Sequence, residues 1–127
     1  MPLVTITQRE GVAPQEQRVV GDIVHDALQQ AGVPAADRFQ RYLTLGAGQL
    51  SIDPTYPNLT EPRSDRTVLI EILWSVGRNV KIKRQVTQFI AKELARRTGI
   101  APRDVFIVFM ETAWENWSFA AGELLNA

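Results

Sequence analysis

The alternation of apolar and polar residues along the chain predicts two helices and four strands. Apolar side chains recur at every second position in some segments and at helical spacing in others, and this change of period occurs twice. The predicted elements are a strand at about 2–8, a helix at about 14–31, a strand at about 38–45, a strand at about 68–74, a helix at about 80–97 and a strand at about 104–111. The order is therefore β-α-β followed by β-α-β.

The second half of the sequence also repeats the first half residue by residue. Residues 32–39 match residues 99–106 at an offset of 67 positions. The pairs produced by this offset include Gly32 with Gly99, Asp37 with Asp104, Val19 with Val86 and Ile23 with Ile90. We therefore predict one α+β domain over residues 1–127, built from pseudo-repeats at about 2–60 and 61–127. Its tandem β-α-β units form one four-stranded sheet with both helices on one face.

This arrangement leaves the other face of the sheet uncovered. Apolar residues such as Val68 or Leu69 would then face water, which favours self-association of the chain. The segment 104–111 is apolar on both faces, as is typical of a strand at the centre of a sheet. Residues 46–65 are rich in Gly and Pro and predict a long loop, with room for a short strand near 50–52.

Composition narrows the range of functions. The chain has 14 Lys and Arg against 14 Asp and Glu, so no overall positive field draws it to nucleic acid or an anionic membrane. It has no cysteine and a single histidine, His25, which argues against thiolate chemistry, a Ser-His-Asp triad or a multi-histidine metal centre. His25 itself is interpreted as structural or solvated. With no signal-like start and no long apolar run, a cytoplasmic location is expected.

Pro2 is the first residue with distinctive chemistry. Removal of Met1 would leave it as a free secondary amine, and a free α-amine titrates at roughly 7.7–8.0. Burial and nearby cations lower the pKa of an amine further, which suits a general base at neutral pH. A secondary amine also condenses with carbonyl compounds to a cationic iminium. The alternative interpretation is that Pro2 merely begins a strand.

Several segments resemble the tautomerase superfamily, and within it the malonate semialdehyde decarboxylase-like group. They include Pro2 at the start of the first strand, residues 33–40, Arg63-Ser64-Asp65, Gly77-Arg78, Gly99-Ile100 with Asp104-Val105, and Trp117-Ser118-Phe119. The resemblance extends over nearly the whole chain. It implies a tandem β-α-β fold assembled as a homotrimer, with the amino-terminal proline as the catalytic group and no cofactor or metal.

The same resemblance implies roles for two charged residues. Asp37 matches a carboxylate that works beside the proline in the decarboxylase, although the repeated Asp104 also allows an ordinary turn role. Arg78 matches one of two arginines that bind the substrate carboxylate, a contact for which a guanidinium fork is well suited. The second arginine of that pair is replaced here by Val76, which argues against strict decarboxylase activity.

Trp117 and Phe119 match aromatic residues that line the family's pocket and desolvate the amine; packing at a subunit interface is compatible with that role. The sequence thus predicts an enzyme that uses Pro2 for enol–keto tautomerisation of a small 2-oxo acid, bound as a carboxylate by Arg78. The alternatives are a malonate semialdehyde-type decarboxylase or hydratase that uses Asp37, and a non-catalytic binding module on the same scaffold.

Overall fold

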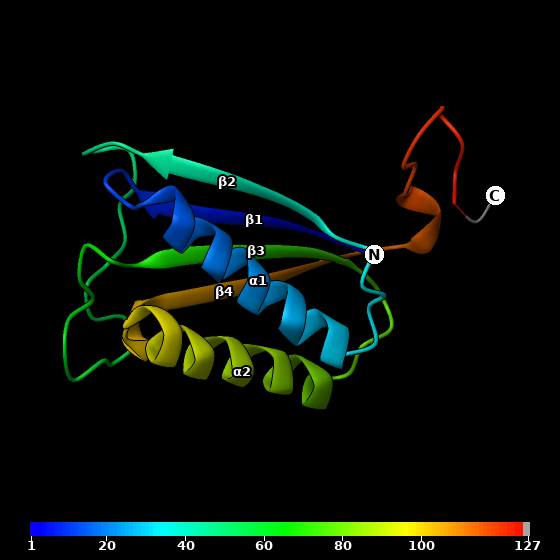
Figure 1. Ribbon diagram of the computed structural model, residues 1–127. Coiled ribbons are helices and arrows are strands. Elements are labelled where there is room, and N and C mark those ends of the chain that lie inside the picture. The colour runs from blue at the N-terminus through cyan, green and yellow to red at the C-terminus, as the bar shows by residue number, and fades with distance from the viewer. Residues whose placement is uncertain (126–127) are drawn as a thin grey trace.

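A computed structural model describes residues 1–125 as one four-stranded sheet with two helices on one of its faces (Figure 1). The elements are β1 (Pro2–Arg9), α1 (Pro14–Gln30), β2 (Phe39–Leu45), β3 (Val68–Ser75), α2 (Val80–Thr98) and β4 (Val105–Thr112), with short 3-10 turns at Pro102–Asp104 and Trp114–Asn116. The predicted fold class is confirmed, and the element boundaries differ from the predicted ones by one residue at most. No strand forms near residues 50–52, where a short one had been allowed.

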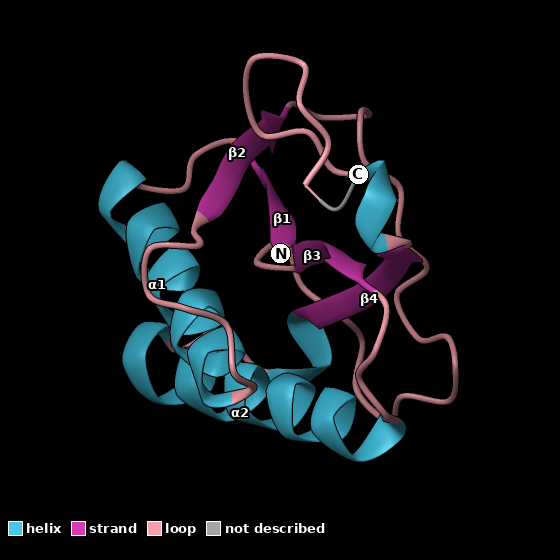
Figure 2. Cartoon of the chain, turned by 90° about the vertical axis from the view of Figure 1, so that its right-hand side faces the viewer, coloured by secondary structure: helices cyan, strands magenta, loops and turns pink. Residues whose placement is uncertain are grey.

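The strand order is β2-β1-β3-β4, so the two β-α-β units meet along their first strands (Figure 2). β1 pairs with β2 and β3 pairs with β4 in parallel, whereas β1 and β3 are antiparallel. Pro2 lies opposite Trp74 in this central pair, and Gln8 lies opposite Val68. The prediction that residues 104–111 occupy the centre of the sheet is wrong, because β4 is an edge strand. Its apolar outer side belongs to the uncovered face of the sheet.

Local sequence explains where the helices begin and end. Pro14 occupies the first turn of α1, where its missing N–H costs nothing. The side chain of Asn79 caps α2 by accepting a hydrogen bond of 3.0 Å from the N–H of Ile82. Gly99 ends α2 with φ 75°, a left-handed conformation that glycine adopts without steric cost. These signals set the bounds of both helices.

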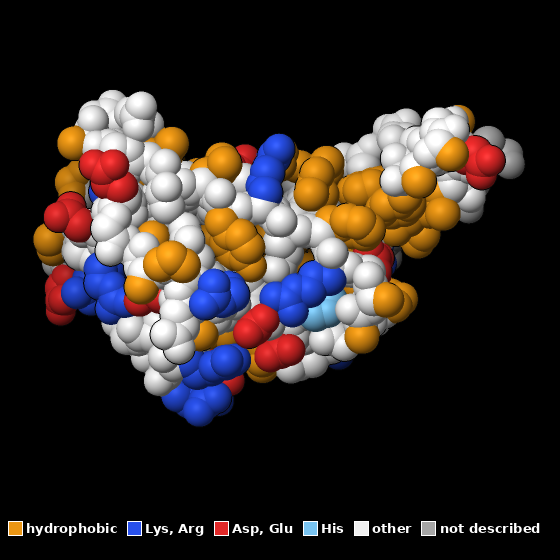
Figure 3. All heavy atoms as spheres, turned by 45° about the horizontal axis from the view of Figure 1, so that its top comes forward, with side chains coloured by type: hydrophobic (Ala, Val, Ile, Leu, Met, Phe, Trp, Pro, Cys, Tyr) orange, Lys and Arg blue, Asp and Glu red, His pale blue; other side chains and the backbone are white. Residues whose placement is uncertain are grey.

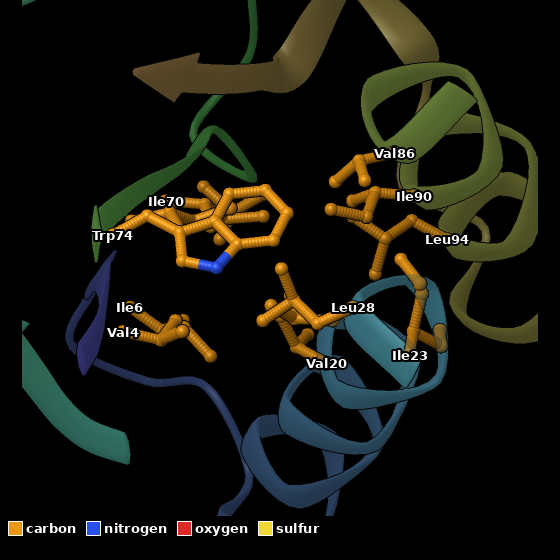
Figure 4. Packing of buried hydrophobic residues seen from close by; sticks show 14 of the residues in the cluster. Val4, Ile6, Val20, Ile23, Leu28, Ile70, Trp74, Val86, Ile90 and Leu94 are labelled. Carbon is orange, nitrogen blue, oxygen red and sulfur yellow. The ribbon is translucent and has the colours of Figure 1, made fainter. Parts of the chain in front are cut away.

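The hydrophobic core lies between the sheet and the helices (Figure 4). Val4 and Ile6 of β1 point into it, and the indole of Trp74 from β3 fills the space between the strands and α1. Each large apolar side chain buried in this way contributes about 1.5–3 kcal/mol. Neither helix has the length and apolarity needed to cross a membrane within the described residues.

The buried positions of the two helices repeat. Val20 and Val86, Val24 and Ile90, and Leu28 and Leu94 are fully buried pairs 66 positions apart. At the predicted offset of 67, Ile23 and Ile90 are fully buried as well, and Val19, the predicted partner of Val86, packs against the core. Burial is therefore compatible with either alignment of the helices.

The open face of the sheet carries large apolar side chains. Phe39 and Leu43 of β2 and Phe106, Val108 and Met110 of β4 are each exposed by between 37% and 44%. Of the two residues named from the sequence, Val68 faces the helices and is fully buried, and Leu69 lies on the open face. An apolar surface of this extent is typical of a contact between subunits.

Candidate active site

The first residues of the chain lie beside Asp37 at one end of the sheet. Pro2 begins β1 opposite Trp74, near the end of β3. Asp37 precedes β2 by two residues, and because β1 and β2 are parallel, their starts lie side by side. The ammonium nitrogen of Met1 is 3.3 Å from the Asp37 Oδ2 atom. Two residues selected from the sequence, Pro2 and Asp37, are therefore brought together by the topology.

The carboxylate of Asp37 makes a contact through only one of its two oxygen atoms. Its side chain is 16% exposed, and its Oδ1 atom is buried with no hydrogen-bond partner among residues 1–125. The backbone N–H of Asp37 donates to the Pro34 carbonyl at 3.0 Å, which closes a turn. His25 lies beneath this turn, with Nε2 2.9 Å from the Ala35 carbonyl oxygen. His25 thus has a structural role, and Asp37 keeps one oxygen free.

Arg78 is fixed at the same end by the loop after β3. Its Nη1 donates to the carbonyl oxygen of Ser75 at 2.9 Å and to the Ser75 Oγ at 3.0 Å. The guanidinium carbon lies 4.5 Å from the centroid of the Trp74 ring and 5.9 Å from that of Trp114. A cation over aromatic faces is held without losing its outward N–H donors. Those donors suit a carboxylate ligand.

Electrostatics couples Arg78 to the neighbouring acids. Burial lowers the pKa of the Arg78 guanidinium, while the negative charges of Asp37 and Glu111 act in the opposite direction. Glu111 is already paired with Lys83, whose Nζ lies 2.6 Å from its Oε1. Of these two acids, Asp37 raises the Arg78 pKa more than Glu111 does. Arg78 stays charged at neutral pH, because a guanidinium loses its proton only under strongly basic conditions.

Aromatic residues that follow β4 reach over the start of β2. The Trp117 and Phe119 rings stack with centroids 5.7 Å apart, and Phe119 stacks on Phe39 at 5.3 Å. The Trp117 Nε1 is buried and has no partner among the described residues. Figure 3 shows hydrophobic atoms gathered at the base of this projecting segment. Trp117 and Phe119 therefore reach the Asp37 end of the sheet through Phe39.

The site combines an amine position, a carboxylate, a guanidinium and aromatic walls. No cluster of three His, Cys, Asp or Glu side chains suited to a metal ion occurs among residues 1–125. The family model described as "Tautomerase enzyme" matches residues 37–120, about two-thirds of the chain. The chain belongs to the tautomerase family.

Probable tautomerases and two decarboxylase structures are similar to this chain over almost its full length. The probable tautomerase YusQ of Bacillus subtilis (strain 168) is 27% identical over 123 residues, covering 96% of this chain and 95% of the relative. A structure of FG41 malonate semialdehyde decarboxylase inhibited by 3-bromopropiolate is 32% identical, with a TM-score of 0.87 and coverage of 95% and 91%. Another malonate semialdehyde decarboxylase, described with decarboxylase and hydratase activities, is 29% identical, with a TM-score of 0.86 and coverage of 95% and 92%.

Two tryptophans of this tautomerase were not selected from the sequence. Trp114 donates its Nε1–H to the Val76 carbonyl at 3.0 Å, which fixes the loop that carries Arg78. The ring of Trp74, a core residue of β3, lies against the Arg78 guanidinium. The sequence signal that could have identified Trp114 is its position shortly after the last strand and three residues before Trp117. The pairing of β3 with β1, which aligns Trp74 with Pro2, has no such local signal.

Proposed function

We propose that this tautomerase catalyses enol–keto tautomerisation of a small 2-oxo acid, with Pro2 as the general base after removal of Met1. The 3.3 Å contact between the Met1 ammonium and Asp37 is the observation that carries this proposal. Without Met1, the secondary amine of Pro2 becomes the terminal nitrogen beside that carboxylate. A free α-amine has an unperturbed pKa of about 7.7–8.0, so a substantial fraction of it is an available base near neutral pH.

In this mechanism the other site residues bind the substrate and exclude water. The N–H donors of Arg78 hold the substrate carboxylate and stabilise the charge that develops on the enolate. Pro2 accepts a proton from the 2-hydroxyl group or from C3 and returns one across the conjugated system. Trp117 and Phe119 keep the amine dry, which favours its neutral form. This reaction needs no cofactor.

Assembly as a homotrimer belongs to the same proposal. The apolar side chains of β2 and β4 on the open face need a cover, and in a closed ring of three copies neighbouring subunits supply one through heterologous contacts. The exposed rings of Phe39 and Phe119 lie where this cover would also complete the pocket walls.

Ketonisation of phenylenolpyruvate tests the proposed base. We expect Pro2→Ala to lower the rate by about 10²–10⁴-fold, as is typical for loss of a general base. Pro14→Ala, at the other end of the sheet, is the matched control and should keep full activity. Intact mass must first show that Met1 is absent, since a peptide bond to Pro2 would abolish its basicity. Equal rates for Met-free wild type and Pro2→Ala would refute the proposal.

Decarboxylation or hydration of a malonate semialdehyde-type substrate is the second candidate. It is favoured by the free, buried Oδ1 of Asp37, which suits positioning of a water molecule. It is weakened by Val76, which occupies the position where the resemblance to the decarboxylase implies a second arginine. A Met-free protein without activity on either substrate class would favour a binding module on this scaffold.

Asp37→Asn separates the two candidates. Tautomerisation by Pro2 should largely survive this change, because Pro2 and Arg78 remain. The water-dependent reactions should collapse, because a neutral amide does not activate water. Rates for both substrates measured on the same preparation distinguish these outcomes. A collapse of ketonisation would make Asp37 part of the tautomerase mechanism.

A further inference from the structure

One positive and one negative side chain lie in the same row on the open face of the sheet. Arg41 of β2 is paired with Thr5 of β1, and Thr5 is paired with Glu71 of β3. Successive side chains of a strand point to opposite faces, and Val4 and Ile6, on either side of Thr5, are buried in the core. The row therefore lies on the face opposite the two helices, both of which Figure 2 shows on one side of the sheet.

The neighbouring rows of the open face contain no charged side chain. From β2 to β4, the strand pairing gives Phe39, Leu3, Leu73 and Met110 in one row, and Leu43, Thr7, Leu69 and Phe106 in the other. The two charges are therefore surrounded by side chains that are mostly apolar. A subunit that covers this face removes water from both charges, which is costly unless each charge gains a partner.

Neither charge has an ionic partner in its own subunit. Among residues 1–125, no ion pair includes Arg41 or Glu71, and the intervening strand separates their backbones by roughly 9–10 Å. The Nε of Arg41 donates to the Thr5 hydroxyl at 2.7 Å, which anchors the guanidinium through one nitrogen and leaves its Nη donors for an acceptor. Arg9 follows Thr5 on the same face of β1, but its Nη1 is enclosed by the protein, whereas Arg41 is exposed. Arg41 is therefore the cation that a second subunit can reach.

We propose that Arg41 of one subunit forms an ion pair with Glu71 of the next subunit around the ring. This inference rests on the homotrimer proposed above and not on the chemistry of Pro2. Contacts in a closed ring of three are heterologous, so two different surfaces of the subunit meet. The β2 half of the open face carries Arg41 and the β3–β4 half carries Glu71, which makes the two halves complementary in charge. The ion pair, repeated at each contact, fixes the register between subunits.

Charge reversal tests whether the pair joins different subunits. Arg41→Glu and Glu71→Arg each place like charges together, so each variant alone should need at least about tenfold more protein than wild type for half-assembly in sedimentation. Co-expression of the two variants should recover part of the lost association, because two of the three contacts in every mixed trimer then join opposite charges. An ion pair within one subunit would give no recovery in the mixture, and that result would overturn the proposal.

The doubly reversed variant Arg41→Glu/Glu71→Arg carries the test where a single variant fails to fold. It should assemble as wild type does. Co-expressed with tagged wild type, it should give few mixed trimers in native mass spectrometry, because a mixed ring contains two contacts between like charges. Random mixing would overturn the proposal.

The matched control is Arg84→Glu, which makes the same charge change as Arg41→Glu on an exposed position of α2, away from the open face. It should keep wild-type assembly. A trimeric wild type that tolerates both single reversals would refute the ion pair alone, and a monomeric wild type would refute it together with the homotrimer. Ketonisation by wild type reports separately on the function proposed for Pro2.

Discussion

The two ends of the sheet are built from equivalent segments but differ in what their aspartates do. Asp37 and Asp104 both precede the second strand of a β-α-β unit, 67 positions apart. Asp104 is 2% exposed and accepts hydrogen bonds from the Ser64 N–H at 2.7 Å, the Ser64 hydroxyl at 2.7 Å and the Thr67 hydroxyl at 2.9 Å. Asp37 has the terminal ammonium of Met1 on one oxygen and no partner from the described chain on the other.

The difference follows from what precedes the first strand of each unit. The strand pairing makes Met1 the counterpart of Thr67, so each aspartate contacts the residue just ahead of the strand. At the Asp104 end, the segment that precedes Thr67 supplies further donors, the N–H and the hydroxyl of Ser64. At the Asp37 end the described residues supply only the Met1 nitrogen, and one carboxylate oxygen has no partner among them. The equivalent position therefore holds a fully hydrogen-bonded aspartate, Asp104, in the second unit. In the first unit it holds Asp37, whose Oδ1 has no partner among the described residues.

Replacing the two aspartates by asparagine should give opposite results, and this is the largest effect that we expect. Asp104→Asn puts an amide NH₂ group against donors from Ser64 or Thr67 and should lower the free energy of unfolding by about 2–4 kcal/mol. Asp37→Asn leaves no donor unpaired in the chain and should cost less than about 1 kcal/mol. Urea unfolding at pH 7 measures both values.

Ser64→Ala is a control for the interpretation of Asp104. It removes one hydroxyl donor but keeps the backbone N–H bond, so it should reproduce only part of the Asp104→Asn loss. Similar destabilisation by Asp37→Asn and Asp104→Asn would show that the two ends are equally structural. The distinction between a cap and a free carboxylate would then be lost.

Val76→Arg adds a second cation to the end of the sheet that carries Asp37 and Arg78. Val76 is 43% exposed, so an arginine side chain fits without disturbing the core. A second charge-assisted contact should lower KM for a small 2-oxo acid by about tenfold. Steady-state kinetics measures this change. Val80→Arg, which adds a cation at the exposed start of α2, is the control; an equal decrease there would point to a general charge effect.

The sequence predicted the fold well because the fold depends on local patterns. Strand alternation, the helical stripes and stop signals such as Gly99 are all encoded within a few residues. The position of β4 was wrong for a physical reason: an apolar strand is buried either by its own sheet or by another subunit, and the sequence pattern is the same.

The site was only partly predictable, since its contacts cross the sheet. Pro2, Asp37 and Arg78 could be selected through a resemblance, and the structure brings them to one end. The support of Arg78 by Trp74 and Trp114 depends on the antiparallel pairing of β3 with β1 and on the course of the chain after β4. Neither is encoded within a short stretch of sequence. The free Oδ1 of Asp37 against the saturated Asp104 is likewise a property of packing.

The acid dependence of stability gives the smallest expected effect and isolates Asp104. Burial disfavours its charged form, but the hydrogen bonds from Ser64 and Thr67 outweigh this and hold the pKa of Asp104 below its usual value. A carboxyl group with a lowered folded-state pKa stabilises the protein above the unfolded value, about 3.9 for Asp, and this contribution is lost as pH falls through the folded value. The difference in unfolding free energy between wild type and Asp104→Asn should therefore be constant from about pH 5 to 7 and shrink below about pH 4. Asp53 and Glu93 also have lowered pKa values, but both proteins carry them, so their contributions cancel in the difference. Urea unfolding of the two proteins at several pH values measures this difference in unfolding free energy. A difference that stays constant at acidic pH would mean that Asp104→Asn destabilises the protein through altered packing and not through loss of the charge.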